Sequence, residues 1–307
     1  MNDSNVATPS KTTKVPQVSI GMPVYNGAKF IHEALDSLLA QTFADFELII
    51  SDNASTDETE AICREYAAKD ERIRYVRQTE NRGALANFRF VLDEAVGEYF
   101  MFAAADDFWS PNWLEELLPL IAKQDVVLAF GASVKTDSEL RYIGRRKIYN
   151  INSRFPSIRM LHYFFIDESG KGNPWYGIFK TSVIKTHGIL DDGGVNFGLD
   201  FRHLFSLSFI GKFASAPNCF LLKRNTIPGL RRHKHSLPIL FGLFFLEFIN
   251  VVKPDRIRYF IDFVKIAPRY HQKILIAACL PLKFVQALVF EYARGIQLGL
   301  EVLKNKI

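Results

Sequence analysis

The sequence predicts an α/β protein with a mostly parallel sheet, and two observations carry that prediction. From Val15 to about Phe130, short apolar runs alternate with segments in which apolar residues recur at helical spacing. The chain has 307 residues, of which 48% are hydrophobic and 23% are charged, so it has a globular composition and enough length to bury a core. Because strands that alternate with helices pair in parallel through right-handed crossovers, we expect a Rossmann-like sheet flanked by helices.

The first half of the chain supplies most of this pattern. A capping box, Ser55-Thr56-Asp57-Glu58, is expected to start one helix, and Pro111 occupies the first turn of another. The expected strands are 18–22, 46–50, 73–76, 99–103 and 126–130, and the expected helices are 30–39, 55–69, 84–95 and 111–122.

The pattern is less regular after residue 130. We expect a hairpin at 134–149, a strand at 175–180 and a helix at 200–209. Beyond Pro238 the chain is expected to form a helical extension, residues 236–307, whose helices are broken by prolines 254, 268 and 281.

The charge of the chain is concentrated in this extension. Residues 236–307 contain 10 Lys and Arg against 5 Asp and Glu, while the first 235 residues balance at 28 against 28. A basic, Phe-rich extension favours contact with an anionic membrane surface over nucleic acid, and helical packing or self-association is the alternative. The longest apolar run without a charge, 236–246, has 11 residues and is too short to span a bilayer.

The ends and cysteines of the chain indicate its compartment. Residues 1–14 are polar and lack the apolar core of a signal peptide, so we expect a flexible leader. Cys63, Cys219 and Cys279 are far apart and form neither a disulfide framework nor a zinc motif. We therefore expect a cytoplasmic protein, either free or peripheral on the inner face of the membrane.

Polar clusters follow three of the expected strands. They are 23–26, 52–57 and the acid pair Asp106-Asp107. Ligands of open α/β sheets bind beyond the carboxyl ends of the strands, so these clusters are expected to share one crevice. There is no GxGxxG after the first strand and no P-loop motif, so a phosphate ligand would need another source of positive charge, such as a divalent metal held by Asp106 or Asp107.

These motifs resemble family 2 glycosyltransferases of the GT-A fold. The resemblance rests on VSIGMPVYNG, ISDNASTDET, ENRGALANF and AAADDFWSP, and covers 17–120 strongly and 173–236 more weakly. It implies a GT-A domain over 15–235, with a nucleotide-binding half at 15–107 and an acceptor half at 108–235. It also implies inverting transfer of a sugar from a nucleotide-diphosphate sugar, with Mg²⁺ or Mn²⁺ bridging the diphosphate.

The resemblance implies roles for residues of the first half. The family's strand ends in Asp-x-Asp-Asp, whereas Ala104 stands here in place of the first acid, so Asp106 is expected to ligate the metal and Asp107 is the second candidate. Asp57 is expected to cap a helix instead of binding substrate. The residues expected to contact the nucleotide sugar are Pro23, Tyr25, Asn26, Asp52, Asn53, Arg82, Gly83, Asn87 and Asp106.

Residues of the second half are expected to serve the acceptor and the reaction. Asp200 matches the family's catalytic base, although Leu199 replaces the Glu that usually precedes it; Asp191 and Asp192 are alternatives, and helix capping is the structural role open to Asp200. Trp175 and Tyr176 are expected to border the acceptor, with core packing as the alternative for Trp175. The basic run at 231–236 is expected to close over the diphosphate through Arg232 and His233, with a solvated or lipid-facing cluster as the alternative.

The sequence thus favours a glycosyltransferase of cell-surface polysaccharide or lipid-linked glycan synthesis. The replacement of an acid by Ala104 leaves open a catalytically silent nucleotide- or glycan-binding module. A nucleotidyltransferase is disfavoured because a glycine-rich first loop carrying Lys or Arg is absent.

Overall fold

The computed structural model describes residues 14–143, 148–166, 173–187, 199–224, 272–280 and 282–283. Strands and helices alternate through its first half. The strands are β1 (Val18–Val24), β2 (Phe46–Asp52), β3 (Ile73–Arg77), β4 (Tyr99–Phe102), β5 (Phe108–Trp109), β6 (Val126–Thr136), β7 (Ile178–Lys180) and β8 (Lys212–Arg224). The helices are α1 (Ile31–Leu39), α2 (Thr59–Lys69), α3 (Ala84–Asp93), α4 (Trp113–Ile121), α5 (Pro156–Phe165), α7 (Thr181–His187) and α8 (Leu199–Ile210), with a 3-10 turn, η1 (Asn173–Tyr176).

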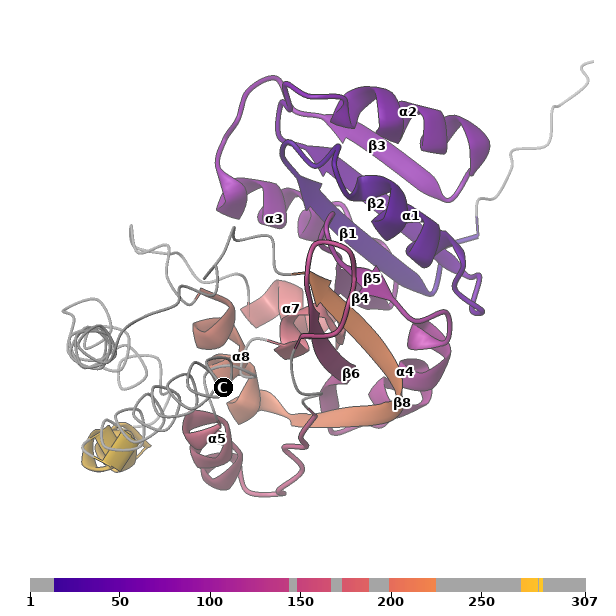
Figure 1. Cartoon of the computed structure of the whole chain (residues 1–307). Helices are drawn as coiled ribbons and strands as arrows, with labels where there is room; N and C mark the ends of the chain where they lie inside the picture. Colours follow the sequence, from indigo (N-terminus) through magenta and orange to yellow (C-terminus); the bar gives the residue numbers. More distant parts are fainter. Residues whose placement is uncertain are drawn as a thin grey trace, which may run out of the picture.

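The described strands form one sheet, in the order β3-β2-β1-β4-β7-β6-β8-β5 (Figure 1). The pairs β3-β2, β2-β1 and β1-β4 are parallel, as their helical crossovers require, and β6-β8 is parallel as well. Strand β7 runs antiparallel between β4 and β6, and β5 runs antiparallel to β8. The expected mostly parallel α/β sheet is confirmed.

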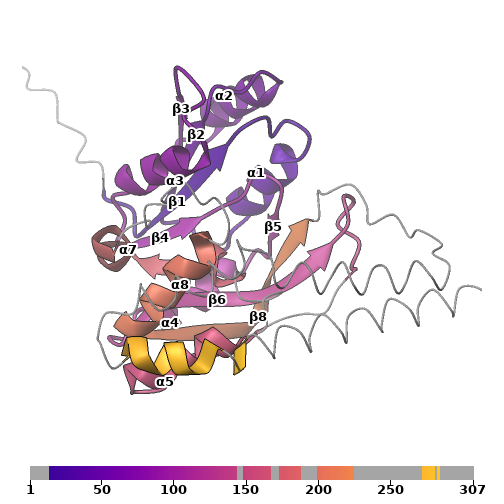
Figure 2. The same ribbon diagram turned by 90° about the vertical axis from the view of Figure 1, so that its left-hand side faces the viewer.

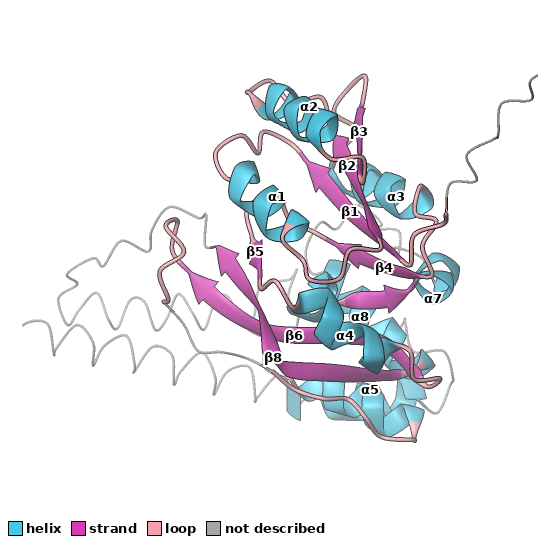
Figure 3. Cartoon of the chain, turned by 90° about the vertical axis from the view of Figure 1, so that its right-hand side faces the viewer, coloured by secondary structure: helices cyan, strands magenta, loops and turns pink. Residues whose placement is uncertain are grey.

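Helices cover both faces of the sheet because the strands alternate their side chains between two cores. In β4, Phe100 and Phe102 enter one core, whereas Tyr99 and Met101 enter the other. The first core packs against α3, α5, α7 and α8, which Figure 2 shows on the near side. The second packs against α1, α2 and α4, seen on the opposite side in Figure 3.

Several local predictions need correction. Helix α2 begins at Thr59, and the Ser55 hydroxyl accepts a hydrogen bond from the Asn26 N–H instead of capping the helix. Strand β6 continues to Thr136, so the predicted hairpin begins later, with a bridge from Thr136 to Tyr142. Only the end of the predicted strand at 175–180 is a strand, since η1 occupies its beginning. Elements β5, α5, α7 and β8 were not predicted.

Parts of the predicted organisation fall where the structure gives no description. Residues 1–13, most of the predicted 236–307 extension, and the candidates Asp191, Asp192, Arg232 and His233 lie outside the described residues. Among the helices that are described, none is long and apolar enough to cross a bilayer.

Candidate functional site

The loops that follow β1, β2 and β4 emerge at one edge of the sheet. Val24, the last residue of β1, is in register with Asp52, the last residue of β2. Gly21 of β1 is in register with Phe102, the last residue of β4. The parallel pairing therefore brings the three polar clusters together, as expected for this fold class.

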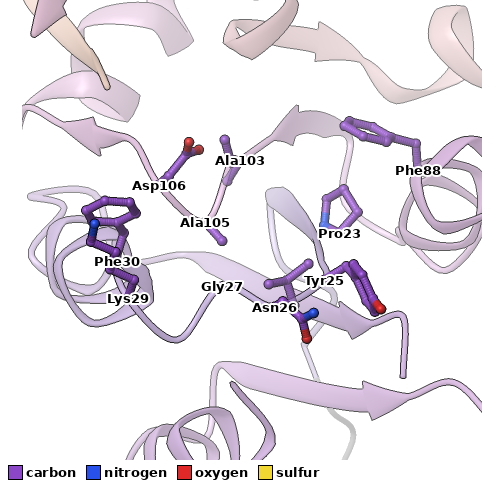
Figure 4. A pocket seen from close by; sticks show the side chains of 12 residues that line it. Pro23, Tyr25, Asn26, Gly27, Lys29, Phe30, Phe88, Ala103, Ala105 and Asp106 are labelled. Carbon is purple, nitrogen blue, oxygen red and sulfur yellow. The ribbon is translucent and has the colours of Figure 1, made fainter. Parts of the chain in front are cut away.

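A cavity of about 410 Å³ opens at this edge, and its two ends are lined by different kinds of side chain. Figure 4 shows Pro23, Tyr25 and Phe88 at one end and Lys29, Phe30 and Asp106 at the other. The remaining lining residues among those described are Val24, Asn26, Gly27, Ala103, Ala104 and Ala105. One end can thus stack against a planar ring, while the other carries charges of both signs.

The loop after β1 is held by the loop after β2. Asn26 adopts a left-handed backbone conformation with φ of 53°. Its N–H donates to Ser55 Oγ at 2.8 Å, and its side-chain Oδ1 accepts from the Thr56 N–H at 2.8 Å. The Gly27 N–H donates to Thr59 Oγ1 at 2.8 Å. These contacts leave the Tyr25 side chain 49% exposed at the mouth of the cavity.

Asp57 ties the same two loops together. Its Oδ1 accepts from the Thr59 N–H at 3.1 Å, and its Oδ2 accepts from the Ala28 N–H at 3.1 Å. Burial acts to raise the pKa of Asp57, but the hydrogen bonds from Thr59 and Ala28 outweigh it and lower the pKa. The predicted capping role of Asp57 needs correction, because the N-cap of α2 is Glu58 and no side chain caps it. Asp57 lies one residue before that position and joins the loop after β1 to the first residue of α2.

Asp52 does not face the cavity, so its predicted contact with a base needs correction. Its side chain is 0% exposed. Oδ1 accepts from the Ser55 N–H at 2.8 Å, and Oδ2 accepts from the Tyr75 hydroxyl at 2.7 Å and from Arg77 Nη1 at 3.2 Å. The carboxylate is engaged by protein donors and orders the end of β2.

Asn53 and the loop at 81–83 also form a structural unit. Asn53 Nδ2 donates to Asn81 Oδ1 at 2.8 Å and to the Gly83 carbonyl at 3.2 Å, while its Oδ1 accepts from the Arg82 N–H at 3.0 Å. Gly83 has a φ of 81°, a conformation that suits glycine. Asn53, Arg82 and Gly83 are not among the described residues that line the cavity, and their contact with the nucleotide sugar stays a prediction.

Asn87 holds two strand ends together inside the protein. Its Oδ1 accepts from the Ser51 hydroxyl, and its Nδ2 donates to the Ser51 carbonyl at 2.9 Å and to the Val24 carbonyl at 3.4 Å. The side chain is buried, and the predicted nucleotide contact is replaced by a structural role. Its neighbour on α3, Phe88, faces the cavity in its place.

The acid pair divides into one cavity residue and one buried residue. Asp106 lines the cavity. Asp107 is 2% exposed, and its Oδ1 accepts from the Arg224 N–H at 2.9 Å. Burial, followed by the charge of Asp106, raises the pKa of Asp107 to about 7, against the opposing effect of Lys223. Of the two acids, Asp106 is the one that the geometry presents to a ligand in the cavity.

The donor set fits a hard divalent cation only in part. Two adjacent carboxylates are oxygen ligands of the type that Mg²⁺ and Mn²⁺ prefer, and Mg²⁺ commonly uses one or two carboxylates plus the phosphates of its substrate. Within the described part of the chain, no group of three or more His, Cys, Asp or Glu side chains could hold a metal by itself. A metal at Asp106 and Asp107 would therefore need ligands from the substrate.

The charges of Asp200, Asp106 and Asp107 all affect the pKa of the Tyr176 hydroxyl. Asp200 lies in the first turn of α8 and is half-buried. Burial raises the pKa of Tyr176, and the charges of Asp107, Asp200 and Asp106 raise it further. Lys223 Nζ lies 4.7 Å from the centroid of the Tyr176 ring. Tyr176 thus lies within electrostatic range of Asp200 and of both acids of the pair.

Trp175 belongs to the core, so its predicted role beside the acceptor needs correction. It is 5% exposed and stacks on Phe102, with centroids 4.9 Å apart and planes 12° apart. His203 and Phe179 contact it edge-on. Protein rings therefore pack against the indole, which lies in η1 just before β7.

Sequence reasoning missed two charged residues near the cavity. Lys29 lines it, with Nζ 4.9 Å from the Phe30 ring centroid. Lys223 ends near Tyr176 and Asp107. The position of Lys29, four residues after Tyr25 in the same strand-end loop, was a usable signal. No local signal marked Lys223, because its proximity depends on β8.

Comparison with known proteins identifies the family. The model of "Glycosyl transferase family 2" matches residues 19–187, which is more than half of the chain. The putative teichuronic acid biosynthesis glycosyltransferase TuaG of Bacillus subtilis is 36% identical over 115 residues, covering 38% of this chain and 46% of that protein. For several matching curated relatives, the chain spans less than half of their length, 23%, 35% and 46% in three of them.

Solved structures establish the fold. S. aureus TarS residues 1–349 in complex with UDP superposes with a TM-score of 0.55 at 17% identity, covering 91% of this chain and 92% of that one. The mannosyltransferase PcManGT from Pyrobaculum calidifontis, in complex with GDP-Man and Mn²⁺, gives a TM-score of 0.52 at 18% identity, covering 96% and 89%. The curled, mostly parallel sheet is thus of the GT-A type, and the chain belongs to glycosyl transferase family 2.

Proposed function

We propose that the protein transfers a sugar, with inversion, from a nucleotide-diphosphate sugar bound in the cavity to a glycan or lipid-linked acceptor in polysaccharide synthesis. The main support for this proposal is that one end of the cavity is lined by rings and the other by charged side chains. Pro23, Tyr25 and Phe88 offer surfaces for a base, and Lys29 and Asp106 offer charges where a diphosphate and its cation would lie. Structural neighbours are described in complex with UDP and with GDP-Man and Mn²⁺, which agrees with a donor of this class.

Each residue of the proposed site has its own role in the reaction. Asp200 accepts the proton of the acceptor hydroxyl, whose oxygen forms a bond to the anomeric carbon as the bond from that carbon to the diphosphate breaks. Lys29 offsets charge on the departing diphosphate. Asp106, with Asp107 behind it, would hold Mg²⁺ or Mn²⁺, which supplies further positive charge when bound.

The proposal is tested with purified protein and a panel of nucleotide sugars, with and without Mn²⁺. We expect calorimetry to detect binding of at least one donor, and we expect slow release of its nucleotide diphosphate. Failure of every donor to bind under both conditions would refute it.

A binding module without catalysis is the second candidate, favoured by Ala104 at an acid position. Asp200→Asn separates the two functions. An enzyme loses turnover and keeps donor affinity, whereas a binding module shows no turnover in either form.

A further inference from the structure

Residues 272–280 and 282–283 form a helical strip along α5, far in sequence from the cavity. Gln272 Nε2 donates to Ser157 Oγ at 3.4 Å near the start of α5, and Lys283 Nζ donates to the Ile166 carbonyl at 3.3 Å just beyond its end. Ile276 is fully buried against the core between these contacts. Figure 2 shows the segment, in yellow, beside α5.

The outward side of this strip is apolar. The exposed residues of the described segment are Ile274, Ala277, Ala278 and Leu282, with Ile274 55% and Leu282 64% exposed. A helix that faces water normally presents polar residues on that side. Phe155 and Ile158, at the start of α5, are 51% and 52% exposed, so the neighbouring helix adds to the apolar surface.

Among the described residues of α5, of the chain just before it and of the strip, the charges are of one sign. Neither α5 nor residues 272–283 contain Asp or Glu. Arg154 is exposed, with its guanidinium 4.6 Å from the Phe155 ring centroid, while His162 is exposed on α5 and Lys273 is half-buried beside Ile274. An apolar face bordered by cations complements an anionic lipid surface, whereas a second copy of the same face would bring like charges together.

We propose that α5 and this strip, residues 272–280 and 282–283, form a docking face for an anionic lipid bilayer. The exposed apolar side chains enter the boundary between headgroups and acyl chains, and Arg154 and Lys273 meet lipid phosphates. This inference is independent of the proposed sugar transfer, since it concerns elements that do not line the cavity.

The test is flotation of the full chain with vesicles of phosphatidylcholine alone or mixed with phosphatidylglycerol. We expect binding to the anionic vesicles, reduced by high salt, and an approximately tenfold or greater loss for Ile274→Glu. Val96→Glu, at an exposed apolar residue outside this face, serves as the matched control and should bind as the wild type does. Arg154→Gln should weaken binding without placing an acid in the face.

Three outcomes would overturn the proposal. The first is that the wild type shows no preference for anionic vesicles. The second is that Ile274→Glu and Val96→Glu lose vesicle binding equally. The third is that the wild type does not bind vesicles but is a dimer in light scattering, and that Ile274→Glu dissociates this dimer. Circular dichroism and thermal unfolding establish that each variant is folded. If Ile274→Glu does not fold, Arg154→Gln decides the question.

Discussion

His203 makes the stability of the protein depend on pH. Its side chain is 0% exposed on α8, and neither ring nitrogen has a hydrogen-bond partner among the described residues. The Trp175 ring lies edge-on to it, with centroids 5.2 Å apart. Burial lowers the pKa of His203 from 6.5 to about 4, and the charge of His187 contributes.

The lowered pKa determines the sign and the size of the effect. Between pH 6.5 and pH 4 the unfolded chain binds more protons at His203 than the folded chain, so the free energy of unfolding decreases as pH falls through this window. At about 1.4 kcal/mol per pKa unit, this amounts to about 3 kcal/mol between pH 7 and pH 4. His203→Leu removes this pH-dependent loss of stability. It also removes two buried nitrogen atoms that have no hydrogen-bond partner among the described residues.

The measurement is urea unfolding, followed by circular dichroism, at pH 7, 5.5 and 4. We expect His203→Leu to be at least as stable as the wild type at pH 7 and to gain about 3 kcal/mol over it by pH 4. His162→Gln, at an exposed histidine of α5, is the control and should leave the pH dependence unchanged. A stability difference between His203→Leu and the wild type that stays constant from pH 7 to pH 4 would refute the reasoning.

Four further predictions concern the site and its support. Asp106→Ala should abolish the dependence of donor binding on Mn²⁺ in calorimetry; unchanged metal dependence would remove Asp106 from the proposed ligands. Lys29→Met should weaken binding of a nucleoside diphosphate about tenfold more than binding of the nucleoside, whereas Lys29→Arg should keep most of the diphosphate affinity. Equal losses of affinity for both ligands would contradict a contact between Lys29 and the diphosphate. Asp52→Asn should lower the free energy of unfolding by about 2 kcal/mol, because three donors lose their carboxylate. Gly131→Ala should lower the free energy of unfolding by about 2 kcal/mol in chemical denaturation, since its Cβ would overlap the Trp113 ring; an unchanged midpoint would argue against that packing.

The sequence predicted the parallel half of the fold well because its signals are local. Apolar periodicity and strand-end polar clusters located β1 to β4 and the helices between them. It predicted the second half less well, because β7 and β8 are defined by pairing with strands distant in sequence. Strand β8, for example, pairs with β6 across 85 to 88 residues, and no local periodicity predicts it.

By itself, the sequence determined the parallel half of the sheet, the resemblance to family 2 glycosyltransferases and the edge of the sheet at which the polar clusters lie. It also identified Pro23, Tyr25, Asn26 and Asp106, which the structure brings to one cavity. Only the tertiary structure decided which side chains of the polar clusters face that cavity. Asp52 turns inward because Tyr75 and Arg77, brought alongside by β3, offer it hydrogen bonds. The direction of a side chain at a strand end depends on such partners, which sequence neighbours do not reveal.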